Sequence, residues 1–293
     1  MGRLFDSLRR IAWLEVEVIF VNNNSDADTV EYVKAFAEEL RQSKGIVAKV
    51  IDEPRPGACA ARNKGLDAAT GHYVYFFDSD DELSPDFFEQ AYSLAQSTNA
   101  DAVGLRINIV KSDGTAIVKN QIPSNNPKFQ IVCNNFSTPS LFLKREFALL
   151  HGRWNNDVPY WNDLEWAFRI MLAKPVISWL PGAWHKTYIH NESITGNFYA
   201  QRIDKIILAH AALTNDIDNC QWPEDSKQHF AHYLNCRKAL YAGRIRKEGA
   251  ADAAKTLYDT IDFASASFLQ RFRYRFLYFL SAIGVPGVWR LGV

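Results

Sequence analysis

The fold is decided by residues 55–89, which read RPGACAARNKGLDAATGHYVYFFDSDDELSPDFFE. An Ala-rich stretch at 58–69 predicts a helix that starts and ends at glycines. The apolar run at 73–77 predicts a short buried strand. Ser84 can cap the next helix and Pro85 suits its first turn. This order of helix, strand and helix is typical of an α/β sheet.

Strands and helices alternate on both sides of this stretch. Short apolar segments at 16–21, 46–51 and 102–107 predict further strands, and the spacing of apolar residues at 28–43 predicts a helix. Such alternation favours parallel pairing in a doubly wound sheet flanked by helices.

The middle of the chain is less regular. The segment at 111–115 (KSDGT) predicts a hairpin turn. Further helices are predicted near 140–150 and 160–173, and they are followed by strands near 176–180 and 183–190. From Asn197 the pattern is almost wholly helical. We therefore predict an α/β domain at 1–196 and a helical region at 197–293.

Composition excludes some classes of protein. Lys plus Arg and Asp plus Glu both number 33 in 293 residues, so the formal net charge is zero. This balance argues against a dedicated nucleic-acid binder. The four cysteines are too far apart in sequence for a zinc or redox motif, and no secretory signal opens the chain. A cytoplasmic protein with reduced thiols is the simplest interpretation.

Four polar residues, Asp78-Ser79-Asp80-Asp81, follow the predicted buried strand directly. Ligands of an α/β sheet bind beyond the carboxyl ends of its strands. Crowded carboxylates repel one another unless a cation or donor compensates, and oxygen ligands suit Mg²⁺ or Mn²⁺. Asp81 is equally well explained as the start of a turn. Arg62 could bind phosphate near the start of its helix, although such residues are more often solvated.

The segment at 21–29 (VNNNSDADT) and the stretch at 55–89 together resemble the inverting family 2 glycosyltransferases of bacterial polysaccharide synthesis. The specific motifs are R-N-x-G-L, A-x-G-x-Y and a strand ending in D-x-D-D, in the family's order and spacing. The resemblance covers about residues 4–195. It implies a GT-A fold with a mixed, mostly parallel sheet, and a nucleotide-sugar donor, with UDP as the default nucleotide.

The resemblance also implies roles for residues around the acidic cluster. Asp78 would contact the ribose or sugar of the donor, Ser79 would also bind the donor, and Asp80 would bind both the donor and the metal. Arg62 would lie near the donor phosphates or sugar. His190, in the segment after the last predicted strand, would be a metal ligand or lid contact, although a structural histidine is at least as plausible.

A catalytic base is implied by the segment at 161–169 (WNDLEWAFR). Inverting transfer needs a base that removes the proton of the acceptor hydroxyl as it attacks the anomeric carbon. Asp163 matches the base of the family, while Asn162 replaces the usual Glu. Glu165 is a competitor on another helix face, and decoration of a helix surface is the alternative explanation for Asp163.

Two departures from the family bear on activity. The family begins with an apolar strand that helps to hold the nucleobase, whereas residues 4–13 resemble the helix that follows it. Asn22 and Asn23 stand where the family carries Asp, and they would bind the edge of a uracil. Either the start lies upstream, or donor binding is impaired, or activity is lost. The alternative function is therefore a truncated, impaired homologue that acts as a binding or scaffold protein. A Rossmann dinucleotide domain is disfavoured because no G-x-G-x-x-G follows the first strand.

The segment at 268–280 (FLQRFRYRFLYFL) combines arginines with aromatic residues. Gly284, Pro286 and Gly287 interrupt the apolar run that follows, which argues against a membrane span. Residues 268–289 are predicted either to lie on the anionic inner face of the cell membrane or to pack on the protein. The leading hypothesis is metal-dependent sugar transfer to a saccharide or lipid-linked acceptor.

Overall fold

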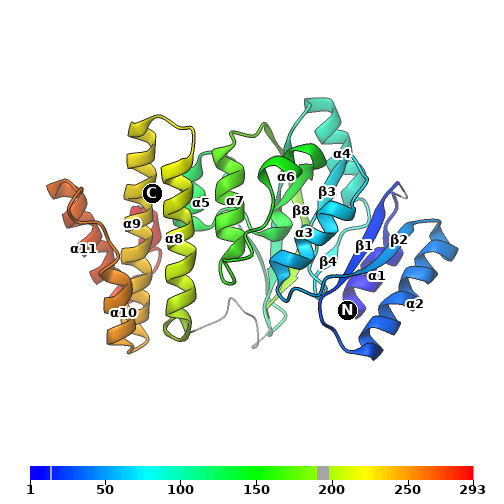
Figure 1. Cartoon of the computed structure of the whole chain (residues 1–293), viewed down its shortest axis with the longest axis horizontal. Helices are drawn as coiled ribbons and strands as arrows, with labels where there is room; N and C mark the ends of the chain where they lie inside the picture. The colour runs from blue at the N-terminus through cyan, green and yellow to red at the C-terminus, as the bar shows by residue number, and fades with distance from the viewer. Residues whose placement is uncertain (14, 120, 190–197, 293) are drawn as a thin grey trace. The chain divides into compact units, whose positions relative to one another are not determined.

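The computed structural model describes every residue except 14, 120, 190–197 and 293. The chain forms two compact units (Figure 1). The first consists of Met1–Asn125, Phe136–Asn156 and Ala173–Ser193, and the second of Asn126–Asn135, Asp157–Leu172 and Ile194–Val293. The last segment of the second unit begins near the predicted boundary at residue 197. Two earlier segments of the chain also belong to the second unit. The assignment of separate functional domains stays a prediction.

A two-stranded parallel sheet opens the first unit. Strands β1 (Glu17–Asn22) and β2 (Val47–Asp52) pair along their whole length, with helices α1 (Gly2–Arg10) and α2 (Ala27–Lys44) packed on them. The rings of Phe5 and Phe36 stack 3.7 Å apart at the centre of this packing. All four elements were predicted to within a few residues.

The second sheet of this unit is mixed. Its strands are β3 (Tyr73–Tyr75), β4 (Glu82–Leu83), β5 (Ala102–Val110), β6 (Ala116–Val118), β7 (Leu141–Lys144) and β8 (Ile177–Tyr188). The order is β3-β7-β5-β8-β4, with β6 forming the predicted hairpin on β5. Within it β5 and β8 pair in parallel and the other pairs are antiparallel. Fewer pairs are parallel than the alternation of elements predicts, because β7 runs antiparallel to both β3 and β5 and β4 runs antiparallel to β8.

Besides α1 and α2, the described part of this unit contains the helices α3 (Ala58–Ala68), α4 (Phe87–Thr98) and α6 (Arg145–His151). Gly57 precedes α3 with a φ of 117°, a conformation that favours glycine. The prediction of one helix over 140–150 is wrong, since a short 3₁₀ turn, η1 (Thr138–Ser140), leads into β7 before α6 begins. Strand β7 forms because the edges of β3 and β5 accept it, which a local pattern does not reveal.

The second unit is helical, as predicted for its C-terminal part. It contains α5 (Pro127–Cys133), α7 (Asn162–Leu172), η2 (Tyr199–Arg202), α8 (Ile203–Asn219), α9 (Glu224–Lys247), α10 (Ala251–Tyr258), α11 (Phe268–Ala282) and η3 (Val288–Gly292). Helix α9 lies between α8 and α11 (Figure 1). Gly243 lets α9 and α11 approach closely, because a Cβ there would lie 2.5 Å from the carbonyl oxygen of Tyr278. Ser281 fixes the same contact by donating to the carbonyl of Leu240 at 2.7 Å.

Candidate active site

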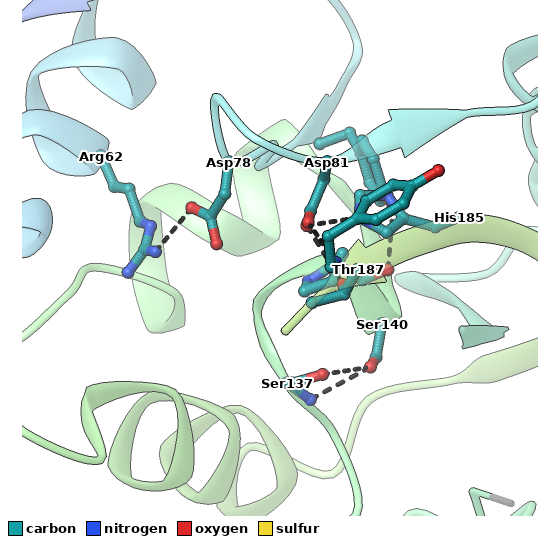
Figure 2. Close-up of polar contacts among 10 residues, drawn as sticks. Arg62, Asp78, Asp81, Ser137, Ser140, His185 and Thr187 are labelled. Carbon is teal, nitrogen blue, oxygen red and sulfur yellow. Dashed lines mark hydrogen bonds and ion pairs between the residues drawn. The ribbon is translucent and has the colours of Figure 1, made fainter. Parts of the chain in front are cut away.

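Arg62 and Asp78 form an ion pair beyond the carboxyl end of β3. The Nη2 of Arg62, on α3, donates to Oδ1 of Asp78 at 2.9 Å (Figure 2). The guanidinium also lies 4.4 Å from the ring centroid of Trp154. Its side chain is 16% exposed and that of Asp78 is 43% exposed. The pair is therefore firmly positioned yet open to solvent on the carboxylate side.

A cavity of about 620 Å³ adjoins this pair. Arg62, Asp78, Ser79 and Asn22 are among the residues that line it. The structure thus brings together four of the predicted donor-binding residues from α3, the acidic loop and the end of β1. Asp80 is exposed in the same loop.

Asp81, in the same loop, is buried. It accepts hydrogen bonds from Nε2 of His185 at 2.7 Å, the hydroxyl of Thr187 at 3.1 Å and the amide of Tyr188 at 3.3 Å (Figure 2). Burial raises the pKa of Asp81, and the hydrogen bond from His185 opposes that rise. Of the two explanations for Asp81, the structure supports a structural role, because its carboxylate fastens the acidic loop to β8.

A metal ion at the acidic loop would need ligands beyond the carboxylates of that loop. No group of three or more His, Cys, Asp or Glu residues that could hold a metal occurs in the described part of the chain. Mg²⁺ usually keeps several waters and binds through one or two carboxylates plus substrate phosphates. The exposed carboxylate of Asp80, near Asp78 and open to solvent, fits that mode of binding. His190, the other predicted metal ligand, lies outside the described residues.

Asn22 and Asn23 both make hydrogen bonds within the protein. The amide of Asn22 donates to Asp52 at 2.7 Å and its oxygen accepts from the amide of Ser25 at 3.0 Å. Asn23 donates to the carbonyls of Glu53 and Arg55 and accepts from the amide of Gly57. Asn23 therefore holds the loop before α3 in place. A nucleobase would have to replace these hydrogen bonds in order to bind the Asn23 side chain. Asn22 remains the better placed of the two, since it lines the cavity.

Asp163 lies in the first turn of α7, in the second unit, and is partly exposed. Its Oδ1 accepts from the amide of Leu164 at 2.9 Å, and its Oδ2 lies 3.4 Å from the side-chain nitrogen of Asn134. The competitor Glu165 is buried and ion-paired with Arg169. Of the two carboxylates, Asp163 is therefore the one able to meet a substrate.

Some residues that support these sites gave no signal in the sequence. Trp154 stacks on Arg62 and follows no motif. The backbone of Trp161, just before Asp163, has a φ of 55°, which is rare for a large residue and typical of functional sites. Buried Arg237 lies 4.5 Å from the ring centroid of Trp161 and 4.6 Å from that of Tyr241. These contacts join residues far apart in sequence, so only the folded chain reveals them.

The fold is that of the GT-A glycosyltransferases. Staphylococcus aureus TarS, residues 1–349 in complex with UDP-GlcNAc, matches with a TM-score of 0.63 at 16% identity, over 96% of this chain and 86% of that chain. The mannosyltransferase PcManGT of Pyrobaculum calidifontis, in complex with GDP-Man and Mn²⁺, matches with a TM-score of 0.58 at 16% identity, over 99% and 81% of the two chains. At these identities the likeness shows the fold alone.

The sequence model of glycosyl transferase family 2 matches residues 1–150, just over half of the chain. The chain therefore belongs to glycosyl transferase family 2. Among curated relatives, the uncharacterized glycosyltransferase YibD of Escherichia coli is 33% identical over 33% of this chain and 26% of its own length. The amylovoran biosynthesis glycosyltransferase AmsB of Erwinia amylovora is 29% identical over 49% and 50% of the two chains. The chain thus matches only a quarter to a half of these two relatives.

Proposed function

We propose that the protein is an inverting glycosyltransferase that moves a sugar from a nucleotide-sugar donor to a saccharide or lipid-linked acceptor in cell-surface polysaccharide synthesis. The observation that carries this proposal is the Arg62–Asp78 pair at a large cavity, next to the exposed Asp80. Membership of family 2 and the relative named for amylovoran biosynthesis support it. The bound UDP-GlcNAc and GDP-Man of the two fold neighbours support a nucleotide-sugar donor.

Arg62 and the acidic loop would bind the donor. The guanidinium of Arg62, fixed on Trp154, presents a forked donor set that suits a phosphate oxygen. Asp78 would accept from a hydroxyl of the ribose or sugar. Asp80 would hold Mg²⁺ or Mn²⁺, which supplies positive charge to offset that of the leaving diphosphate. UDP is the default nucleotide.

Asp163 would act as the general base. Its carboxylate accepts the proton of the acceptor hydroxyl while that oxygen bonds to the anomeric carbon and the bond to the nucleoside diphosphate breaks. The amide of Leu164 fixes Oδ1 of Asp163, which leaves Oδ2, with its long contact to Asn134, for the acceptor. Attack by the acceptor oxygen on the side opposite the departing diphosphate gives inversion at the anomeric carbon.

Release of UDP from UDP-sugars with Mn²⁺ tests the function, and Asp163→Asn separates chemistry from binding. We expect Asp163→Asn to bind UDP as the unmodified chain does and to lose about 99% or more of turnover, since general bases contribute roughly 10²–10⁴-fold. Asp204→Asn, in the first turn of α8, is the control and should keep full turnover. Near-normal turnover of Asp163→Asn would exclude the base role. UDP binding by the unmodified chain without transfer to any acceptor would favour the binding or scaffold function.

Helix α11 supports a peripheral location on the cytoplasmic face of a membrane. One of its stripes, with Tyr274, Leu277 and Ser281, is buried against the other helices of its unit. A second stripe is exposed and consists of Phe268, Phe272, Phe276, Phe279 and Ile283. A helix that is apolar on two faces needs a second apolar environment. Arg271 and Arg275 on the same helix suit anionic headgroups. No helix among the described residues is long and apolar enough to cross a membrane.

Flotation with vesicles tests the membrane contact. The chain should float with vesicles of phosphatidylcholine and phosphatidylglycerol, and a Phe272→Ser, Phe276→Ser double variant should float much less. Leu208→Ser, at an exposed position on α8, is the control and should float like the unmodified chain. Equal flotation of the double variant would exclude α11 as the contact surface.

A further inference from the structure

Arg237, on α9, is a cation inside the second unit, and none of the ion pairs of the described residues includes it. Its side chain is 1% exposed. Its Nη1 donates to the carbonyl oxygen of Ile131 at 2.9 Å, whereas its Nε has no hydrogen-bond partner. Burial lowers the pKa of Arg237, because a guanidinium loses its hydration in the core. A buried charge without a carboxylate is costly, and an apolar side chain of similar size is often at least as stable.

Two aromatic rings hold the guanidinium of Arg237. It lies 4.5 Å from the ring centroid of Trp161 and 4.6 Å from that of Tyr241. The two rings also contact each other, with their centroids 4.5 Å apart and their planes at 64°. A cation is attracted to the face of an aromatic ring, most strongly to that of Trp. Arg237 therefore fixes the place of the Trp161 ring, because a movement of that ring would break both contacts.

The position of Trp161 decides how α7 begins. Its carbonyl oxygen accepts from the amides of Leu164 at 3.1 Å and Glu165 at 3.3 Å, which are the first hydrogen bonds of this helix. Its φ of 55° is costly for a large residue and persists only where the surrounding structure enforces it. Asp163 lies between Trp161 and these two amides in the chain. The contact of Arg237 with the Trp161 ring therefore supports the turn that presents the Asp163 carboxylate.

Arg237 also contacts the helix that holds the other side of this turn. The carbonyl to which it donates belongs to Ile131, on α5. On either side of Ile131 in that helix region, Gln130 donates to the carbonyl oxygen of Asp163 at 3.5 Å, and Asn134 donates to Oδ2 of Asp163 at 3.4 Å. One buried side chain thus joins the two structures, Trp161 and α5, that flank Asp163.

We propose that Arg237 is a positioning residue for sugar transfer. By contacting both Trp161 and α5, it holds the first turn of α7, and with it the carboxylate of Asp163, in the place that the general base needs. The inference rests on the proposed function, since Asp163 acts as a base only in that reaction. A role in activity explains why the core contains a charge that stability alone does not favour.

Arg237→Met tests the proposal, because it keeps the length of the side chain and removes the guanidinium. We expect kcat to fall by about 10- to 100-fold, since a small displacement of a catalytic group can cost that much. UDP affinity and the KM for the donor should stay unchanged. Arg237→Lys keeps the charge but not the planar fork, so its kcat should lie between those two proteins. Lys238→Met is the matched control and should keep full turnover, because Lys238 donates to the carbonyl of Thr260 instead.

Hydrogen exchange supplies a second measurement that needs no activity. The amides of Leu164 and Glu165 should exchange roughly tenfold faster in Arg237→Met, which corresponds to the weakening of about one hydrogen bond. Exchange in α11 should not change. If the unmodified chain transfers no sugar to any acceptor, the proposed function fails, and the exchange comparison still decides whether Arg237 positions α7.

Unchanged exchange of the first turn of α7 in Arg237→Met would overturn the proposal, and so would unchanged kcat in a chain that transfers sugar. An equal loss of kcat in Lys238→Met would also overturn it, because the effect would then follow from removing any cation of α9. A parallel loss of UDP affinity in Arg237→Met would assign the effect to general unfolding. Should Arg237→Met not fold, Arg237→Lys decides, and full turnover of that variant would contradict the positioning role.

Discussion

Replacing Asp216 by Asn should make the protein more stable at alkaline pH. Asp216 lies on α8, and its pKa is raised from 3.8 to about 7 by burial and by the negative charge of Glu165. Its Oδ2 is buried and has no hydrogen-bond partner among the described residues. An acid whose pKa is higher in the folded state binds a proton on folding. Its stabilising contribution is complete below its unfolded pKa and is lost as pH rises through about 7.

The rise to about 7 corresponds to at most about 4 kcal/mol of folding free energy. Because the side chain is partly exposed, we expect about 1–2 kcal/mol. Urea denaturation at about pH 5 and about pH 8.5 measures it. At about pH 8.5 the free energy of unfolding of Asp216→Asn should exceed that of the unmodified chain by about 1–2 kcal/mol. From about pH 5 to about pH 8.5 the variant should lose less stability than the unmodified chain does. Asp218→Asn, exposed on the same helix, is the control. A variant less stable than the unmodified chain at both pH values would refute the reasoning.

Three further substitutions test the site and its supports. Arg62→Ala should weaken UDP binding by about 10- to 100-fold in calorimetry, because a charged hydrogen bond contributes about 1.5–3 kcal/mol, while Arg153→Ala, in an exposed pair, should leave it unchanged; equal losses in both would refute a specific role. Asp81→Ala should lower the free energy of unfolding by about 3–4 kcal/mol, because the buried ring of His185 loses its carboxylate partner. A loss below about 1 kcal/mol would contradict the structural role of Asp81. Gly243→Ala should cost about 1–3 kcal/mol by overpacking against α11, and wild-type stability would show that α11 does not pack there.

The sequence predicts the first unit well wherever local patterns decide. Strand β1 was predicted at 16–21 and lies at Glu17–Asn22, and α3 was predicted at 58–69 and lies at Ala58–Ala68. Glycine, capping and periodicity signals act within a few residues. Strand β7 was missed because its partners, β3 and β5, are distant in sequence.

The candidate site was predicted in its residues but not in its interactions. The order Asp78-Ser79-Asp80-Asp81 did not show that Asp81 turns inward to His185 while Asp78 meets Arg62. In an irregular loop that follows a strand, tertiary contacts decide which side chains point into the protein and which point to solvent. The hydrogen bonds of Asn23 to the loop before α3 were equally hidden.

Calorimetric titration of the unmodified chain and of Asp80→Ala with UDP, in Mn²⁺ and then in EDTA, tests the central claim most directly. We predict that the unmodified chain binds UDP with Mn²⁺ and much more weakly in EDTA, and that Asp80→Ala binds weakly in both. UDP binding that is the same in both proteins and indifferent to Mn²⁺ would contradict the assignment of the acidic loop as the seat of a metal and a diphosphate.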